Sequence, residues 1–359
     1  MKRNCLWMLG VAAVLAACSN HEVVEEAAQS EIPFDGKVTL TAEPDISVIQ
    51  SRAVVETWKN TPIRVWGLSN DQTGWTDASG NLFAPAEYVN GVVADGTGAV
   101  KLGSGVDVYF YPLQSDANFS FYGCSPHPDY NSPATDGTVR VQYTVTGNKD
   151  ILWGEAVAED IQGTDGKTYK GYNARYFRKA SSPIVPKLQF KHLLSQLQFE
   201  VVGGDKSATS GDVQAVQVKN ITVLAQNNAY LNVAGARKGT LDPYGESTEI
   251  PAYFGDEPYN KKLDVNPGQK TQAGTAMVLP STTGKYTLNV TLAAMVGGKE
   301  KLHTTPIEIT YKENGQVTPF QAGKAYKVSL TVYGLRIVNI EAGLNNWEQA
   351  GEIIDQEVN

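Results

Sequence analysis

The chain has 359 residues, of which 42% are hydrophobic and 19% are charged, and its formal net charge is −8 at pH 7. This length allows about two domains at a typical 100 to 200 residues each. An acidic balance argues against the concentrated basic face that binds phosphate, so we expect no nucleic-acid partner.

The N-terminus has the parts of a signal peptide. Lys2 and Arg3 form a short cationic segment, and residues 6–15 form an apolar segment too short to span a bilayer. The following Leu15-Ala16-Ala17-Cys18 resembles the lipobox of bacterial lipoproteins, in which the cysteine is acylated and the bond before it is cut. We therefore expect residues 1–17 to be removed between Ala17 and Cys18. The alternative is an ordinary secreted protein in which a cysteine lies beside the cut by chance.

Residues 18–36 carry acidic side chains and no Lys or Arg, which predicts a solvated tether. Acyl chains such as palmitate on Cys18 would hold the mature chain to a membrane, at roughly 0.8 kcal/mol per buried methylene. Acidic residues soon after the lipidated cysteine resemble the surface-export signal of Bacteroidetes lipoproteins. We expect a surface-exposed protein of the cell outer membrane.

Alternation of apolar and polar residues dominates the rest of the chain. Residues 37–43 place Val38, Leu40 and Ala42 on one face, as a half-buried strand requires. Glycine-rich turn signals separate many further short runs of this kind, and no long amphipathic helix is visible. The pattern predicts an all-β protein of antiparallel β-sandwiches. The runs are 63–68, 106–111, 119–122, 139–145, 188–202, 221–225, 286–293, 307–311 and 326–332.

Residues 169–186 are polar and basic, contain prolines, and interrupt the strand pattern near the midpoint. We place the domain boundary there. The prediction is an N-terminal β-sandwich domain at 37–187 and a C-terminal one at 188–359.

Sequence motifs for catalysis or cofactor binding are missing. The 4 histidines have no metal-ligand spacing, and neither a phosphate-binding loop nor a nucleophile elbow is present. Cys5 leaves with the signal peptide and Cys18 is acylated, so Cys124 cannot form an intramolecular disulfide and is interpreted as a structural thiol. We expect no cofactor, no metal and no enzymatic activity.

Several segments, in order along most of the mature chain, together resemble the fimbrillin family, the pilus subunits of Bacteroidales. They are Ser51-Arg52-Ala53, Val65-Trp66-Gly67, residues 109–112 followed by 119–122, residues 150–153, residues 190–197 and residues 320–328. The resemblance implies two transthyretin-like β-sandwich domains and partners that are other fimbrial subunits.

The same resemblance implies a maturation step. A protease would cut after Arg52, leave Ala53 as the new N-terminus, and remove the strand that contains Val38, Leu40 and Ala42. The vacated groove could accept a strand from another subunit, because its backbone groups would be unpaired. In this family the donor is C-terminal, which points to the tail at 334–359. Its candidate donor residues are Leu335, Ile337, Ile340, Trp347 and Ile353.

A second interpretation keeps Cys18 attached and makes the protein a permanent fimbrial anchor or a lipoprotein that binds surface glycans. Loop aromatics could then stack on sugar rings, although we expect them to cap the ends of the sandwiches. These aromatics are Trp75, Tyr88, Tyr130 and Tyr259. Host or bacterial surface glycans or proteins remain possible ligands under either interpretation.

Overall fold

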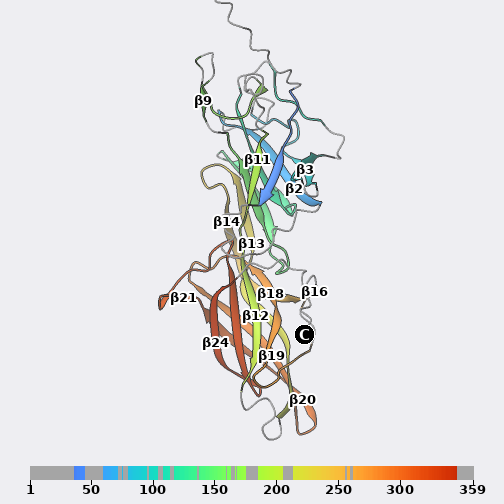
Figure 1. Ribbon diagram of the computed structural model, residues 1–359, viewed down its shortest axis with the longest axis vertical. Helices are drawn as coiled ribbons and strands as arrows, with labels where there is room; N and C mark the ends of the chain where they lie inside the picture. Colours follow the sequence, from blue (N-terminus) through green and yellow to red (C-terminus); the bar gives the residue numbers. More distant parts are fainter. Residues whose placement is uncertain are drawn as a thin grey trace, which may run out of the picture.

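The computed structural model describes residues 36–44, 60–71, 75, 80–94, 97–103, 108–113, 117–135, 137–158, 160–162, 166, 168–174, 185–204, 213–254, 257–258 and 262–345. All of the named elements in these residues are β-strands, which confirms the predicted all-β class. The molecule is elongated, with its strands running mostly along the long axis (Figure 1). Three sheets account for most of the strands, and we name them upper, shared and lower by their place in Figure 1.

The upper sheet has seven strands in the order β1-β11-β8-β5-β2-β3-β4. Its neighbouring strands are antiparallel except for β1 and β11, which run parallel. The strands are β1 (Thr41–Pro44), β2 (Thr61–Ser69), β3 (Val89–Val93), β4 (Val100–Leu102), β5 (Phe119–Ser125), β8 (Leu152–Ala156) and β11 (Lys187–His192).

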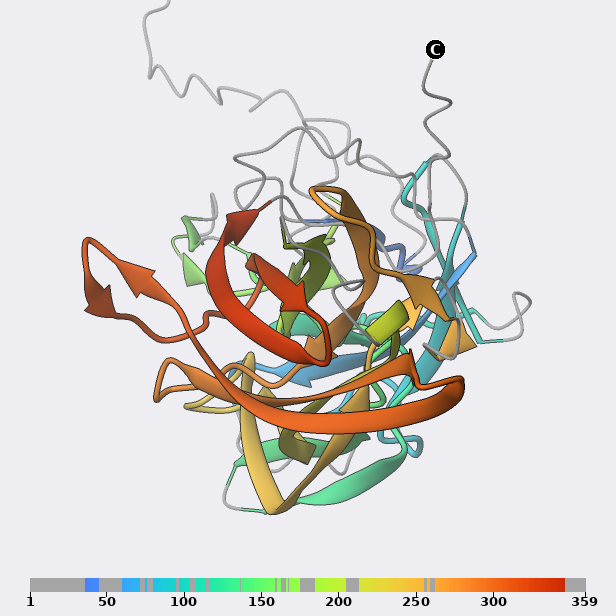
Figure 2. The same ribbon diagram turned by 90° about the horizontal axis from the view of Figure 1, so that it is seen from below.

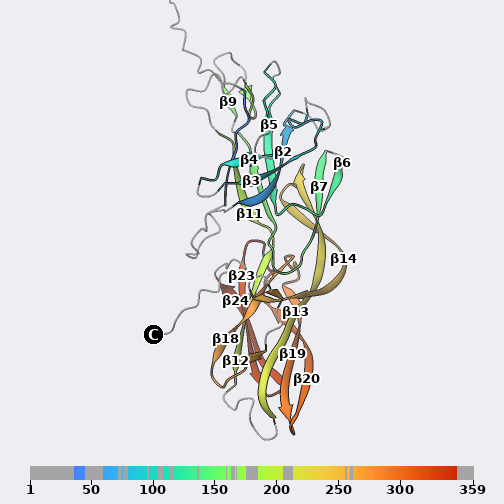
Figure 3. The same ribbon diagram turned by 90° about the vertical axis from the view of Figure 1, so that its right-hand side faces the viewer.

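The shared sheet also has seven strands and extends over both ends of the molecule (Figure 3). Its path is β20-β19-β13-β7-β6, and β14 and β17 pair with β13. The strands are β6 (Tyr130–Thr135), β7 (Thr138–Thr144), β13 (Val213–Ala234), β14 (Thr240–Pro251), β17 (Leu263–Asp264), β19 (Lys285–Val296) and β20 (Lys299–Thr310).

The lower sheet has six strands in the order β16-β15-β18-β12-β23-β24. Seen end-on, the red β23 and β24 and the orange β19 and β20 face each other as two layers of a sandwich (Figure 2). The strands are β12 (Ser195–Gly203), β15 (Tyr253–Phe254), β16 (Glu257–Pro258), β18 (Lys270–Val278), β23 (Ala325–Tyr333) and β24 (Arg336–Asn345). Two small ribbons complete the fold: β9 (Ile161–Gln162) with β10 (Thr168–Tyr169), and β21 (Lys312–Glu313) with β22 (Gln316–Val317).

The run at 188–202, expected as one strand, is divided in the structure. Residues 187–192 pair with β8 in the upper sheet, and residues 195–203 pair with β18 and β23 in the lower sheet. The chain passes between the two sheets at Leu193 and Leu194, both of which are buried. A period-2 pattern continues across such a passage because both strands need alternating burial, so periodicity alone could not locate it. The division into two domains at 187/188 stays a prediction.

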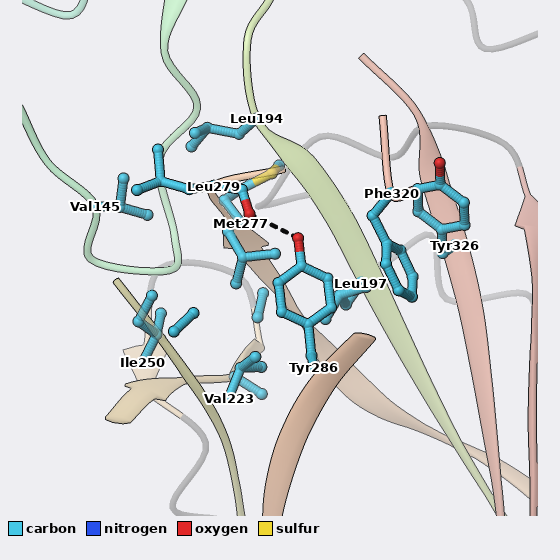
Figure 4. Packing of buried hydrophobic residues seen from close by; sticks show 14 of the residues in the cluster. Val145, Leu194, Leu197, Val223, Ile250, Met277, Leu279, Tyr286, Phe320 and Tyr326 are labelled. Carbon is cyan, nitrogen blue, oxygen red and sulfur yellow. Dashed lines mark hydrogen bonds between the residues drawn. The ribbon is translucent and has the colours of Figure 1, made fainter. Parts of the chain in front are cut away.

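The larger core fills the space between the shared sheet and the other two. In Figure 4, Tyr286 from β19 lies among aliphatic side chains of β12 and β18, with Phe320 and Tyr326 close by. The hydroxyl of Tyr286 donates a hydrogen bond of 2.6 Å to the carbonyl of Leu279. A phenol can be buried at this depth because its one donor has a partner.

The turn between β13 and β14 reaches the face of the upper sheet that carries Trp153, a residue of the larger core. There the indole Nε1 of Trp153 donates to the carbonyl of Val233 at 3.0 Å, and Lys238 forms an ion pair with Glu155 at 2.5 Å. Gly239 has a φ of +71°, and a Cβ on it would lie 2.7 Å from the ring of Trp153. The turn therefore fits against Trp153 only with glycine at this position.

Replacing this glycine tests the contact. Gly239→Ala adds both the strain of a left-handed alanine, about 1–2 kcal/mol, and an overpacking cost of about 1–3 kcal/mol against Trp153. Gly245→Ala is the control, because its φ is +81° but its Cβ would meet nothing nearer than Asn228 Nδ2 at 3.8 Å. Denaturant unfolding should show a larger loss for Gly239→Ala. Equal losses would mean that Trp153 does not confine the turn.

Candidate functional site

Residues 36–44, which end in β1 and are called the first strand below, lie in a groove. They are hydrogen-bonded along both edges. On one side the first strand runs parallel to β11, and Thr41 N donates to the carbonyl of Pro186 at 3.0 Å. On the other side it is antiparallel to two short segments, 98–100 and 109–111. Four backbone bonds of 2.7–2.9 Å join residues 36–42 to these segments. Figure 1 shows the blue strand beside β11.

The alternation predicted for residues 37–43 is present in the structure. Val38, Leu40 and Ala42 are 5%, 3% and 4% exposed, whereas Lys37 and Thr39 lie at the surface. The three inward side chains belong to a second core, formed on the inner face of the upper sheet. The first strand is thus a structural member of this sheet rather than a loose extension.

The floor of the groove is aromatic. Phe121 lies between two rings, with centroid distances of 6.2 Å to Tyr111 and 5.9 Å to Tyr172. Phe190 on β11 extends over the neighbouring backbone, since a Cβ on Gly123 or on Gly154 would lie 2.8 Å from its ring. These glycines leave room for a phenyl ring beneath the end of the first strand.

At Ala42 the backbone of the first strand closely approaches the backbone of Gly98. The amide of Ala42 donates to the carbonyl of Gly98 at 2.7 Å, and a Cβ on Gly98 would lie 2.6 Å from the carbonyl oxygen of Ala42. On the other side its Cα partner is Leu188, which is fully buried. The two backbones therefore leave no room for a side chain at residue 98.

The outer face of the groove carries an ion pair at one end and exposed apolar side chains at the other. Lys187 Nζ lies 3.0 Å from Glu43 Oε2. At the other end Phe110 forms a bridge with Lys37 and is 55% exposed, with Val108 and Leu113 also exposed beside it in the chain. Exposed aromatic side chains of this kind mark contact surfaces more often than isolated aliphatic ones.

Two of the C-terminal candidates, Ile337 and Ile340, lie on β24 at the opposite end of the molecule, and Leu335 directly precedes this strand. This strand pairs antiparallel with β23 and forms the edge of the lower sheet. Leu335 and Ile337 are half-buried against the larger core, and Ile340 occupies the register position beside Leu330. The role of these C-terminal residues as a donor strand stays a prediction.

Six predicted site residues lie outside the described residues: Ala17, Cys18, Arg52, Ala53, Trp347 and Ile353. Of the loop aromatics, Tyr259 also lies outside them. Trp75 and Tyr88 pack against the larger core, as expected for capping residues, whereas Tyr130 is 69% exposed. Among the residues that the structure does describe, no helix is long and apolar enough to cross a membrane.

Three residues have side chains of the kinds that carry chemistry: Cys124, His127 and His192. Cys124 is fully buried, and burial raises the pKa of its thiol to about 12. The neighbouring His127 points its Nε2 at the carbonyl of Ile63, at 3.1 Å. His192 pairs through Nδ1 with the carboxylate of Asp150. These contacts give each group a structural partner.

Sequence reasoning did not identify the second wall of the groove. The sequence predicts an ordinary strand at 106–111 and no strand at Gly98, whereas the structure joins residues 98–100 and 109–111 to the first strand. A close approach between two backbones produces no alternation of apolar and polar residues that could be recognised in the sequence. Only the glycine at 98 could have suggested it.

Comparisons with known proteins identify the family of the chain. Residues 51–347 match the model of a family described as fimbrillin-like. No curated protein matches the chain. The fold is similar to that of a candidate cell adhesion protein of Bacteroides uniformis, with 16% identity, a TM-score of 0.50, and 88% of this chain and 100% of that chain covered.

A candidate cell adhesion protein of Parabacteroides distasonis has the same fold at 8% identity and a TM-score of 0.50, with 89% of this chain and 97% of that chain covered. At such low identities the likeness concerns the fold alone. The family match extends over most of the chain and includes both the groove and β24. The chain belongs to the fimbrillin-like family.

Proposed function

We propose that this protein is a structural subunit of a surface fimbria that serves adhesion. It is exported as a lipoprotein precursor anchored through Cys18 in the outer membrane, and subunits polymerise by strand exchange after a protease cuts at Arg52. The observation that carries this proposal is the placement of residues 36–44 in the groove. Membership of the fimbrillin-like family and the adhesion proteins of similar fold support it.

The groove suits a strand that is exchanged. Burying Val38 and Leu40 contributes roughly 1.5–3 kcal/mol each, and every backbone hydrogen bond adds a net ~1 kcal/mol. Ordering a free strand costs about 1–2 kcal/mol per residue. While the first strand is covalently attached, the cost of ordering it is small and it stays in the groove. Once it is cut off, a donor strand with apolar side chains at the same spacing can replace it. The predicted cut at Arg52 follows Pro44 and would sever the strand from the rest of the chain.

The alternative is a permanently anchored protein, in which the first strand stays in place and Cys18 keeps its lipid. Of the predicted loop aromatics that the structure describes, Tyr130 has the exposed ring, which favours glycan binding in this form. An enzymatic function has no support in the buried Cys124 or in the partnered His127 and His192.

The N-terminus of protein recovered from the cell surface should be Ala53. Arg52→Ala should leave the intact, acylated chain and no fimbriae, because the groove stays occupied. Arg52→Lys is the matched control if the protease accepts either basic side chain. N-terminal sequencing and electron microscopy provide the readouts. If the only form at the surface began at a blocked, acylated Cys18, the permanently anchored protein would be supported and the polymerising subunit rejected.

A peptide of residues 36–44 should refill the groove of cleaved subunits and stop their assembly. The same peptide with Leu40→Asp should have no effect, because a carboxylate would be buried among aromatic rings without a partner. Light scattering during assembly measures both. If the two peptides inhibit equally, the groove does not recognise the inward side chains.

Cys124 should resist alkylation while the protein is folded. With a pKa of about 12, its thiol is ionised in about one molecule in ten thousand at pH 8. Iodoacetamide labelling should be at least about a hundredfold slower than in denaturant, where the pKa returns to about 8.5. Rapid labelling of the folded protein would reopen the possibility of a reactive cysteine.

A further inference from the structure

Four strands of the shared sheet present a polar and aromatic face to solvent. Figure 3 shows β6, β7 and β14 along one side of the molecule, and β13 pairs with both β7 and β14. A row of outward residues crosses these strands, each the Cα partner of the next: Tyr130, Gln142, Tyr230 and Asp242. Val141, beside Gln142 in the chain, points the other way and is buried in the larger core. Cross-strand partners project from one face of a sheet, so the row lies together on the outer face.

Tyr230 is the centre of this face. Its ring stacks on that of Tyr244, with 4.6 Å between the centroids and 28° between the planes. The guanidinium of Arg140 lies 5.0 Å from the centroid of the Tyr230 ring, and Gln142 Nε2 donates to the Tyr230 hydroxyl at 3.1 Å. Side chains fixed in this way lose little conformational entropy when a ligand binds. The face is therefore preorganised.

The row ends in a carboxylate that is held by three side chains. Asp242 accepts a hydrogen bond of 2.6 Å from Arg140 and one of 3.0 Å from Asn232. It also forms an ion pair with Arg237. Burial alone would raise the pKa of Asp242, but these donors hold it below its ordinary value. The side chain of Arg237 is 66% exposed, so its donors can reach a ligand in solution.

Tyr130 begins β6 at the other end of the row, and its ring is 69% exposed. β6 is an edge strand that is fixed to the upper sheet through Asn131, whose Oδ1 accepts a hydrogen bond of 2.6 Å from the buried Arg64. Arg64 also donates to Asn90 Oδ1 at 2.9 Å. Packing of the sheet explains the stacked ring of Tyr230, but it does not explain a large exposed ring held at the edge.

The chemistry of this face matches a glycan better than a protein. The core of a protein interface is depleted of charged side chains, whereas this face combines guanidinium, carboxylate and amide groups with tyrosine rings. A sugar ring has apolar C–H groups that pack on an aromatic face, and hydroxyls that donate to a carboxylate and accept from a guanidinium. Tyr130 and Tyr230 are two strand spacings apart, about 9.5 Å, which is close to the length of two linked sugar rings.

The charges on this face favour a neutral glycan. Arg140 and Arg237 are balanced by Asp242 and by Asp129, whose carboxylate accepts from the backbone N of Thr144 at 2.7 Å. The whole chain has a formal net charge of −8, which repels an anionic polymer. Hydrogen bonds to sugar hydroxyls need no net charge on either side.

We propose that the outer face of β6, β7, β13 and β14 binds a neutral glycan. One sugar ring stacks on Tyr130, and hydroxyls of the next rings pair with Gln142, Arg237 and Asp242. The inference rests on the adhesive part of the proposed function and deepens it. The face shares no residue with the groove, so subunits in a fimbria would repeat it, and many weak contacts would add up to firm attachment.

Titration calorimetry tests the site directly. The full-length chain with Cys18→Ser, which cannot be acylated at that residue, is titrated with linear oligosaccharides of glucose, galactose, mannose or N-acetylglucosamine. At least one of these should bind, and polygalacturonate should bind at least about tenfold more weakly because it is anionic.

The exposed ring is tested by substitution. Tyr130→Ala should lower the affinity at least about tenfold, because the stacked ring is lost, whereas Tyr130→Phe should keep most of the affinity. Leu302→Ala is the matched control, since it removes a side chain that is 63% exposed on β20 of the same sheet. It should leave binding unchanged.

A further variant tests the polar end of the row. Arg237→Ala should weaken binding at least about fivefold, because hydrogen bonds from a charged donor to the sugar are lost. Lys285→Ala is its control, since it breaks another exposed ion pair of the same sheet, with Glu308. All of these variants should melt within about 2 °C of the parent chain, because they change exposed side chains.

The outcomes separate this inference from the proposed function. Failure of every neutral probe to bind, full affinity of Tyr130→Ala, or a preference for polygalacturonate would overturn the inference. Fimbriae that form normally from such a chain would leave the proposed function standing. Glycan binding by a chain that forms no fimbriae after cleavage at Arg52 would support the site and reject the polymer. Should Tyr130→Ala not fold, Arg237→Ala and its control still decide.

Discussion

The upper sheet depends on a strand that lies between two walls and is covalently close to a predicted cleavage point. Its backbone is bonded to β11 on one side and to residues 98–100 and 109–111 on the other, and its inward side chains complete an aromatic core. Without it, both walls would expose unpaired amide and carbonyl groups, and the rings of Tyr111 and Phe121 would lose their cover. A sheet with such exposed edges would readily pair with another strand that fits the gap.

The same requirement explains the geometry around the groove. Gly98 lets two backbones approach, while Gly123 and Gly154 make room for the ring of Phe190. A strand that must fit at both edges and on its inner face is specified by three constraints at once. Any strand that occupied the groove would have to match its spacing along both edges.

Much of the fold follows from alternation in the sequence, and the reasons for the exceptions are physical. The inward face of residues 37–43 was evident because Val38, Leu40 and Ala42 are separated by polar residues, and most of the other runs became strands. The passage between sheets at Leu193 was not evident, because buried residues continue the pattern on both sides. The wall around Gly98 depends on contacts between distant segments, which one sequence cannot reveal.

The shared sheet also determines how the molecule responds to pulling. β13 has 22 residues, which at about 3.3 Å per residue extend roughly 70 Å, and it pairs with β19 toward one end and β7 toward the other. Tension along the long axis of the molecule would act along these ladders, so their hydrogen bonds would be stressed in shear and resist together. In a peeling geometry they would break one after another. A filament of such subunits would hold under flow because each subunit contributes one uninterrupted strand along the direction of force.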